Sequence, residues 1–135
     1  MKKLVSCIAI ALCAAILAGC GPKTPDAVAL KFVQATAIDG DIEAAKKYMS
    51  EDTKKLVDAA IALGSDDMKK EMKKTSEKAK KAGAKASVKD TKIDGDKATV
   101  VIAVTGKGED GKEETQTETV NLVKENGEWK VAVKK

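Results

Sequence analysis

The chain contains no histidine, and all 25 of its basic residues are lysine, so arginine is absent as well. Without histidine there is no imidazole base that titrates near neutral pH, and no Ser-His or Cys-His nucleophile pair. Without arginine there is no planar fork that binds phosphate, carboxylate or guanine through two hydrogen bonds. A catalytic site would have to be built from Asp, Glu, Lys, Tyr or Ser, and no spacing in the sequence indicates one.

Cysteine and aromatic residues are also scarce. Cys7, Cys13 and Cys20 all lie in the first twenty residues, so the rest of the chain has no thiol for a disulfide. Because His and Cys are both missing beyond residue 20, no zinc site is expected there. A folded domain must therefore have a thin and mostly aliphatic core. Its only aromatic residues are Phe32, Tyr48 and Trp129.

The first twenty residues follow the pattern of a signal peptide. Lys2 and Lys3 form a short basic segment, and the uncharged apolar run of residues 4–18 follows it. A membrane-spanning helix needs about 20 apolar residues, and a Gly-Pro pair and a lysine interrupt this run too early. We therefore expect residues 1–19 to be removed as a signal peptide rather than to span a membrane.

The apolar run ends in Leu17-Ala18-Gly19-Cys20, which resembles the lipobox of bacterial lipoproteins at every position. In that family the cysteine thiol receives a diacylglyceryl group and the chain is cut just before it. Two acyl chains such as palmitate hold a protein stably at a bilayer, whereas one does so only marginally. The resemblance implies lipid attachment at Cys20 and a tether at residues 20–23. It also implies a domain held outside the cytoplasm, on the cell membrane or the outer membrane.

A single domain is expected over residues 24–135, and it begins with helices. Thr24 can cap a first helix that has Pro25 at its first position, and Gly40 ends that helix. Asp41 can then cap a short second helix.

A third helix is predicted from a Ser50 cap to Gly64, and residues 65–85 follow it with eight lysines against four acids. We expect this segment to be a solvated helix with a narrow buried seam, because its acids dilute the charge and no Trp or Phe marks membrane insertion. The alternative is a basic face that lies against anionic lipid. The apolar face expected in the third helix comprises Leu56, Val57, Ala60, Ile61 and Leu63.

Beyond residue 86 the hydrophobic period changes from 3.6 to 2, which indicates strands. Short glycine-containing turns at 94–96, 108–111 and 126–127 join antiparallel neighbours. The expected strands are 87–93, 97–106, 112–124 and 128–134. The face expected to pack on the helices comprises Val100, Ile102, Val104, Val120, Leu122, Trp129, Val131 and Val133.

The stretches TPDAVALKFVQATAIDGDIEAAKKYMSEDT (24–53) and NGEWKV (126–131) resemble small bacterial lipoproteins of the nuclear transport factor 2-like, cystatin-like superfamily, in a branch of unknown function. The resemblance implies an α+β fold with N-terminal helices packed on a curved four-stranded antiparallel sheet. In that superfamily the sheet and first helix form a cone whose open end can hold a small apolar molecule. The positions that carry the resemblance are Pro25, Phe32, Gly40, Asp41, Ala45, Tyr48, Ser50 and residues 127–131.

The resemblance leaves the function open, because one fold hosts many functions. We expect a non-enzymatic lipoprotein whose domain binds a small apolar ligand or a protein partner of the cell envelope. The alternative is a structural or interaction module with a filled core and no ligand pocket. A cryptic enzyme would need a buried Asp or Glu facing the cavity. We can place none, because the sheet positions that face the cone are expected to be Val, Ile and Leu.

No catalytic residue, cofactor or metal site is assigned. The acid-rich stretches at 94–96 and 109–114 lack the ligand spacing of a calcium loop, and hairpin turns explain them. Nucleic acid is not expected as a partner, because the charge is balanced and arginine is missing. Phe32, Tyr48 and Trp129 are the possible pocket residues, although core positions are the preferred interpretation. The oligomeric state is left open.

Overall fold

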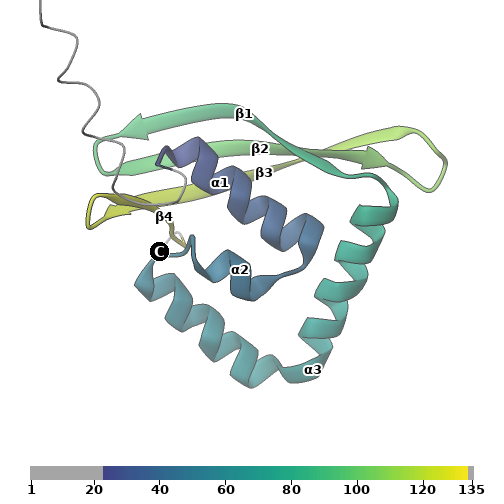
Figure 1. Cartoon of the computed structure of the whole chain (residues 1–135), viewed down its shortest axis with the longest axis horizontal. Coiled ribbons are helices and arrows are strands. Elements are labelled where there is room, and N and C mark those ends of the chain that lie inside the picture. The colour runs from purple at the N-terminus through teal and green to yellow at the C-terminus, as the bar shows by residue number, and fades with distance from the viewer. Residues whose placement is uncertain (1–22, 134–135) are drawn as a thin grey trace, which may run out of the picture.

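The computed structural model describes residues 23–133, in which helices pack on one face of a four-stranded antiparallel sheet (Figure 1). The signal segment, Cys20 and the last two residues lie outside the described residues. The strands pair in the order β1-β2-β3-β4, so the predicted α+β class and hairpin meander are confirmed. The elements are α1 (Pro25–Val33), the π-helical η1 (Gln34–Asp39), α2 (Ile42–Lys46), α3 (Glu51–Lys81), β1 (Lys85–Asp94), β2 (Lys97–Lys107), β3 (Glu113–Glu125) and β4 (Glu128–Val131).

Two of the three predicted helix caps form. The Asp41 carboxylate accepts a hydrogen bond from the Ala44 N–H at 3.0 Å, and this bond starts α2. The Ser50 hydroxyl accepts one from the Thr53 N–H at 3.3 Å and starts α3. Thr24 occupies the N-cap position of α1, but its side chain makes no capping bond, so that detail of the prediction is wrong.

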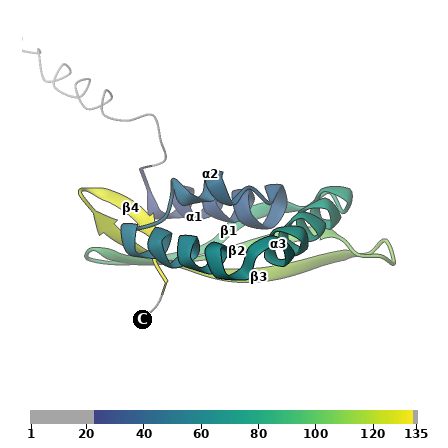
Figure 2. The same ribbon diagram turned by 90° about the horizontal axis from the view of Figure 1, so that it is seen from below.

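The core lies between α1 and the sheet. The side chains of Val33, Val100, Ile102 and Leu122 are the largest that are fully buried, and Trp129 closes the cluster at the β4 end. Figure 2 shows α1 and α2 above this face of the sheet. The expected helix-facing valines and leucine are therefore confirmed except at Val133, which is exposed because β4 ends at Val131.

α3 is one continuous helix of 31 residues, and the predicted end at Gly64 is wrong. A glycine inside a helix costs only about 1 kcal/mol relative to alanine, and the good helix formers on both sides of Gly64 offset this cost. In Figure 1 α3 bends, and its first limb (residues 51–64) and second limb (residues 65–81) frame α1 and α2. Lys46 ties α2 to the first limb, because its Nζ lies 2.6 Å from Asp58 Oδ1. The hydrogen bond to Asp58, together with a second one to Glu43, raises the pKa of Lys46 above its ordinary value.

The second limb of α3 contacts the corner between η1 and α2 at Gly40. Gly40 has a φ of 65°, which is the left-handed conformation that favours glycine. A Cβ atom placed there would lie 2.6 Å from Ser76 Oγ and 2.7 Å from Ser76 Cβ. Ser76 is 4% exposed, and its hydroxyl donates to the Lys73 carbonyl at 2.8 Å, so it has little room to move.

We predict that Gly40→Ala destabilises the protein more than the same change at Gly95. Both glycines have positive φ, so alanine costs about 1–2 kcal/mol at either position. Gly95 has no neighbour within 4 Å of its missing Cβ, whereas Gly40 meets Ser76, which adds about 1–3 kcal/mol of overpacking. Denaturant unfolding measures the two free energies. Equal losses would show that α3 does not pack on this corner.

Candidate functional site

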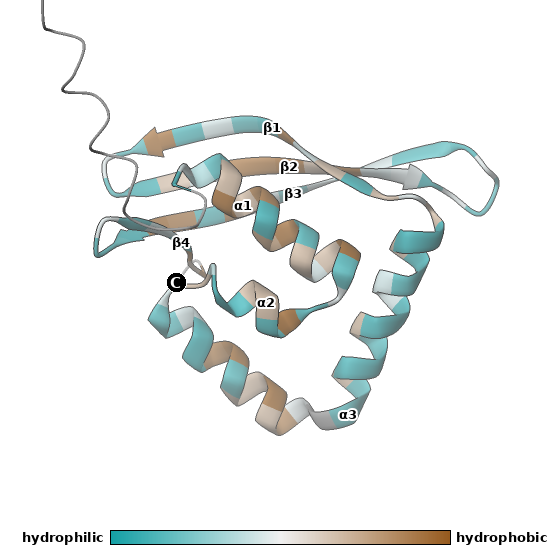
Figure 3. Ribbon diagram, in the orientation of Figure 1, coloured by the Kyte–Doolittle hydropathy of each residue, from teal (hydrophilic) through white to brown (hydrophobic). Residues whose placement is uncertain are grey.

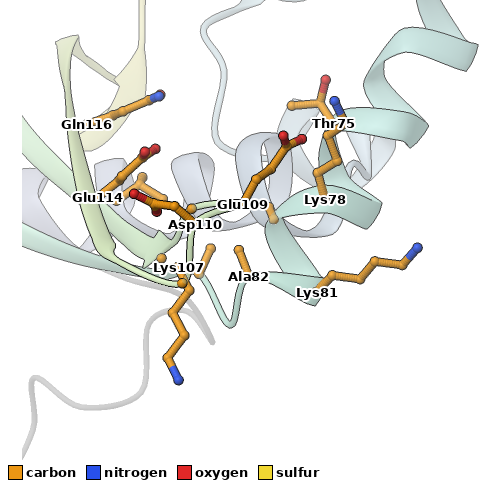
Figure 4. Close-up of a pocket in the computed structure, with 15 residues that line it drawn as sticks. Thr75, Lys78, Lys81, Ala82, Lys107, Glu109, Asp110, Glu114 and Gln116 are labelled. Carbon is orange, nitrogen blue, oxygen red and sulfur yellow. The ribbon is translucent and has the colours of Figure 1, made fainter.

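A groove lies between the second limb of α3 and the β2–β3 hairpin, where β2 ends and β3 begins (Figure 4). Its volume is about 1020 Å³ and it is wide open to solvent. Its lining includes apolar residues, among them Ala79 of α3, Ala82 just after α3 and Val104 of β2, together with charged residues of both signs. Because the groove is open, it does not enclose a small molecule in the way that most small-ligand sites do.

The end of the groove is closed where β2 meets the last turn of α3. The Lys107 N–H donates to the Ala82 carbonyl at 2.9 Å, which satisfies one of the free carbonyls at the helix end. A Cβ atom on Gly106 would lie 3.3 Å from Ala82 Cβ, so glycine permits this close approach. The β2–β3 hairpin is thereby held against α3, and the two elements form the walls of the groove.

Charged side chains of both signs line the groove, and they differ in direction. Figure 4 shows Glu109 of the hairpin directed across the groove toward Thr75 and Lys78 of α3. Lys81 and Lys107 point away from it in the same view. The sheet wall of the groove is therefore mainly acidic, and Lys78 stands on the opposite wall.

The register of β2 and β3 places polar residues at helix-facing positions. The two residues of an antiparallel pair point to the same face of the sheet, and Ile102 and Val104 pack with the core. Their partners on β3 therefore also face the helices, and they are acidic or amide residues. The expectation that these positions are Val, Ile and Leu is wrong for the first half of β3. The pairs are Ile102–Glu118, Val104–Gln116 and Gly106–Glu114.

The same half of β3 has a free edge within the described chain. β4 pairs only with residues 122–125, and beyond it the Ala132 N–H donates to the Asn121 carbonyl at 2.9 Å. In Figure 1 β4 accordingly lies beside one end of β3 only. Successive residues of a strand direct their backbone groups to opposite sides. Every second residue before Asn121 therefore directs its backbone N–H and C=O groups away from β2, to the side where no described strand lies. These residues are Glu113, Thr115, Thr117 and Thr119.

The three aromatic residues lie in or against the core and not in the groove. Trp129 is 9% exposed, and Phe32 and Tyr48 are half-buried against the core clusters. Met49 beside them is buried. Between α1 and the sheet, where the resemblance implied a cone, Val33, Val100 and Ile102 have no exposed surface, so no water-sized space adjoins these three side chains.

The first limb of α3 exposes part of its predicted apolar face (Figure 3). Val57 and Ile61 are half-buried, whereas Leu56, Ala60 and Leu63 face solvent. Leu56 is 57% exposed and Leu63 is 88% exposed. The expectation that all five apolar positions face the core is wrong for these three. Exposed apolar side chains that cluster in this way are typical of contact surfaces.

Within residues 23–133 the other chemical signals are weak. No described Asp or Glu is buried, since the buried polar residues are Ser50, Thr53 and Ser76. The same residues contain no group of three possible metal ligands. None of the described helices has the length and apolar character needed to cross a membrane. Cys20 lies outside the described residues, so the structure does not bear on it.

The helices packed on a four-stranded antiparallel sheet give this protein the same fold as a solved NTF2-like protein. The chain belongs to the family described as a domain of unknown function, DUF4878, whose model matches residues 18–132. A similar solved structure is that of a Campylobacter jejuni protein described, provisionally, as an NTF2-like transpeptidase. The two share 21% sequence identity with a TM-score of 0.60, over 82% of this chain and 99% of the other. No curated protein matches the chain.

We predict that Leu63→Ala leaves stability unchanged, whereas Leu122→Ala is costly. Leu122 is 1% exposed, and truncating a buried leucine costs about 2–5 kcal/mol. Leu63 is almost wholly exposed, so the change should stay within about 0.5 kcal/mol. Thermal or denaturant unfolding of the two variants measures this difference. A loss of 2 kcal/mol or more at Leu63, about the least expected of a buried leucine, would mean that the Leu63 side chain is itself buried against the domain.

Proposed function

We propose that this protein is an exported lipoprotein, anchored through Cys20, whose domain binds a protein partner of the envelope through its surface. The observation that carries the proposal is the filled space between α1 and the sheet. Val33, Ile102 and Trp129 occupy the region in which a small apolar ligand would have to lie. Of the two readings left open by the sequence, this favours an interaction module with a filled core.

Two surface features support a protein partner. The exposed leucines of α3 offer apolar contact area, and the groove beside β3 offers charged groups next to unpaired backbone. Protein interfaces combine an apolar centre with a polar rim in this way. The anchor itself is supported by the basic segment, the apolar run and the match to the lipobox in the first twenty residues.

A non-enzymatic role is part of the proposal. The Campylobacter jejuni protein is described as a transpeptidase, and acyl transfer of that kind needs a nucleophile with a base beside it. Among the described residues the Ser50 hydroxyl bonds to Thr53 Oγ1, and the Ser76 hydroxyl bonds to the Lys73 carbonyl. Both serines are buried and serve helix structure, so neither supports this chemistry. Ser87 is exposed on β1, but the chain has no histidine to act as its base.

We predict that Cys20→Ala moves the protein out of the membrane fraction, because the acyl chains have no other thiol to join at the cleavage site. Cys13→Ala is the matched control, since Cys13 lies inside the apolar run and should be dispensable. Fractionation of cells that express each variant, with metabolic labelling by a fatty acid, measures both effects. Labelled, membrane-bound protein from the Cys20 variant would contradict the anchor.

Native mass spectrometry of the full chain from its own envelope in detergent tests the binding mode. We expect a complex whose extra mass is that of a second polypeptide in fixed stoichiometry. A bound apolar small molecule in fixed stoichiometry, with no second polypeptide, would contradict the proposal. The same measurement on Leu56→Lys with Leu63→Lys reports whether the exposed leucines contribute to the complex, because neither change should affect the core.

A further inference from the structure

We propose that the free edge of β3, residues 113–119, binds an extended segment of the partner protein that carries basic side chains. The inference rests on the proposed function and adds to it the surface and the chemistry of the partner. The segment would pair with β3 as an additional strand, in the position that β4 leaves empty beyond Asn121. Backbone hydrogen bonds would give affinity, and alternate side chains would give specificity.

The free half of β3 lacks most of the features that usually protect a sheet edge and keeps only the negative charge of its glutamates. Proteins block such edges with charged side chains, above all lysine, and with inward-pointing charges, proline, bulges or a covering element. β1, the other edge strand, has lysines and a bulge between Val88 and Asp90. Residues 113–119 contain neither lysine nor proline, and their pairing with β2 has no irregularity. Every side chain in this stretch is exposed, so no element among residues 23–133 covers it.

Charge determines which segment this edge accepts. Residues 113–119 carry three glutamates and no basic residue. Glu114 and Glu118 face the helix side of the sheet with Gln116 between them, and Glu109 stands on the adjoining hairpin. A strand added here would place alternate side chains beside these carboxylates. Opposite charges on neighbouring strands stabilise the pairing and like charges weaken it. The edge therefore favours a segment that has lysine or arginine at two positions four residues apart, beside Glu114 and Glu118.

The outer face of the same edge requires a different side chain. Thr115, Thr117 and Thr119 point away from the helices, and Thr115 Oγ1 lies 2.9 Å from Thr105 Oγ1 on β2. β-branched residues pack well on such a surface. A segment that alternates β-branched and basic residues therefore fits both faces. A second copy of β3 fits poorly, because antiparallel self-pairing about Gln116 would place Glu114 opposite Glu118 of the other chain.

A peptide titration tests the assignment on the full chain in detergent. The probe is the heptapeptide Val-Lys-Val-Thr-Val-Lys-Val with blocked ends, and the control has glutamate in place of both lysines. We expect the lysine peptide to bind about tenfold more tightly at low salt, with the ratio falling as salt is added. Bound peptide should slow hydrogen exchange of the amides of Thr115, Thr117 and Thr119.

Two variants separate this edge from other surfaces. Thr117→Pro removes an N–H that points away from β2, so the fold should survive while the peptide is lost. Thr91→Pro makes the same change on β1, because the pairing of Asp94 with Lys97 places the Thr91 N–H on the side away from β2. This variant should bind the peptide as the parent protein does. Glu114→Lys combined with Glu118→Lys should reverse the preference and favour the glutamate peptide, which a misfolded variant could not do.

Several outcomes would overturn the assignment. The first is equal binding of the lysine and glutamate peptides. The second is slowed hydrogen exchange at amides other than those of Thr115, Thr117 and Thr119. The third is an equal loss of peptide binding in the two proline variants. Protection of the same amides without peptide, in a chain found to be dimeric, would show that a second copy occupies the edge. If no peptide binds while a partner polypeptide is retained in native mass spectrometry, only the edge is wrong. If no partner is retained, the proposed function fails first.

Discussion

The contact between α1 and one face of the sheet is the interaction on which the rest of this structure depends. The chain has one Trp, one Tyr and one Phe, and beyond Cys20 it has no thiol, so a disulfide or a large aromatic core cannot stabilise the domain. Stability rests on small aliphatic side chains, among which Val33, Val100, Ile102 and Leu122 are fully buried. Each contributes about 1.5–3 kcal/mol by leaving water, provided that no void remains beside it. Val33, Val100 and Ile102 have no exposed surface, so no water-sized space adjoins them in this thin core.

The helices and β4 cover only part of the sheet, and the uncovered part contains the groove and the free edge of β3. α1 covers the half of the sheet that carries Val120, Leu122 and β4, and the short β4 completes the sheet only there. Toward the β2–β3 hairpin the inward positions of β3 become Glu and Gln, and α3 stands beside the sheet rather than on it. The open groove and the free strand edge therefore arise together. The groove lies where α3 stands beside the sheet, and the free edge lies where β4 ends.

Local features of the fold could be predicted from the sequence because neighbouring residues determine them. The Asp41 and Ser50 caps satisfy N–H groups three residues on, and the turn at Asn126 and Gly127 has the two positive φ values that this pair favours. The continuity of α3 through Gly64 was missed because the helix formers on both sides outweigh the cost of a single glycine. The exposure of Leu56 and Leu63 depends on where the helix lies, which periodicity alone does not reveal. The third predicted strand is longer than the fourth, and this difference could have indicated the free edge of β3. The acidic side chains on the sheet side of the groove could be found only from the pairing of β2 with β3.

The central claim is that the space between α1 and the sheet is filled, so that the domain acts through its surface. Crystals of the domain pressurised with xenon would test this most directly, since xenon enters dry apolar cavities large enough to hold it. We predict no xenon between Val33, Ile102 and Trp129. A well-occupied xenon site bounded by these residues would reveal an apolar cavity, restore the small apolar ligand as the leading interpretation and contradict this account.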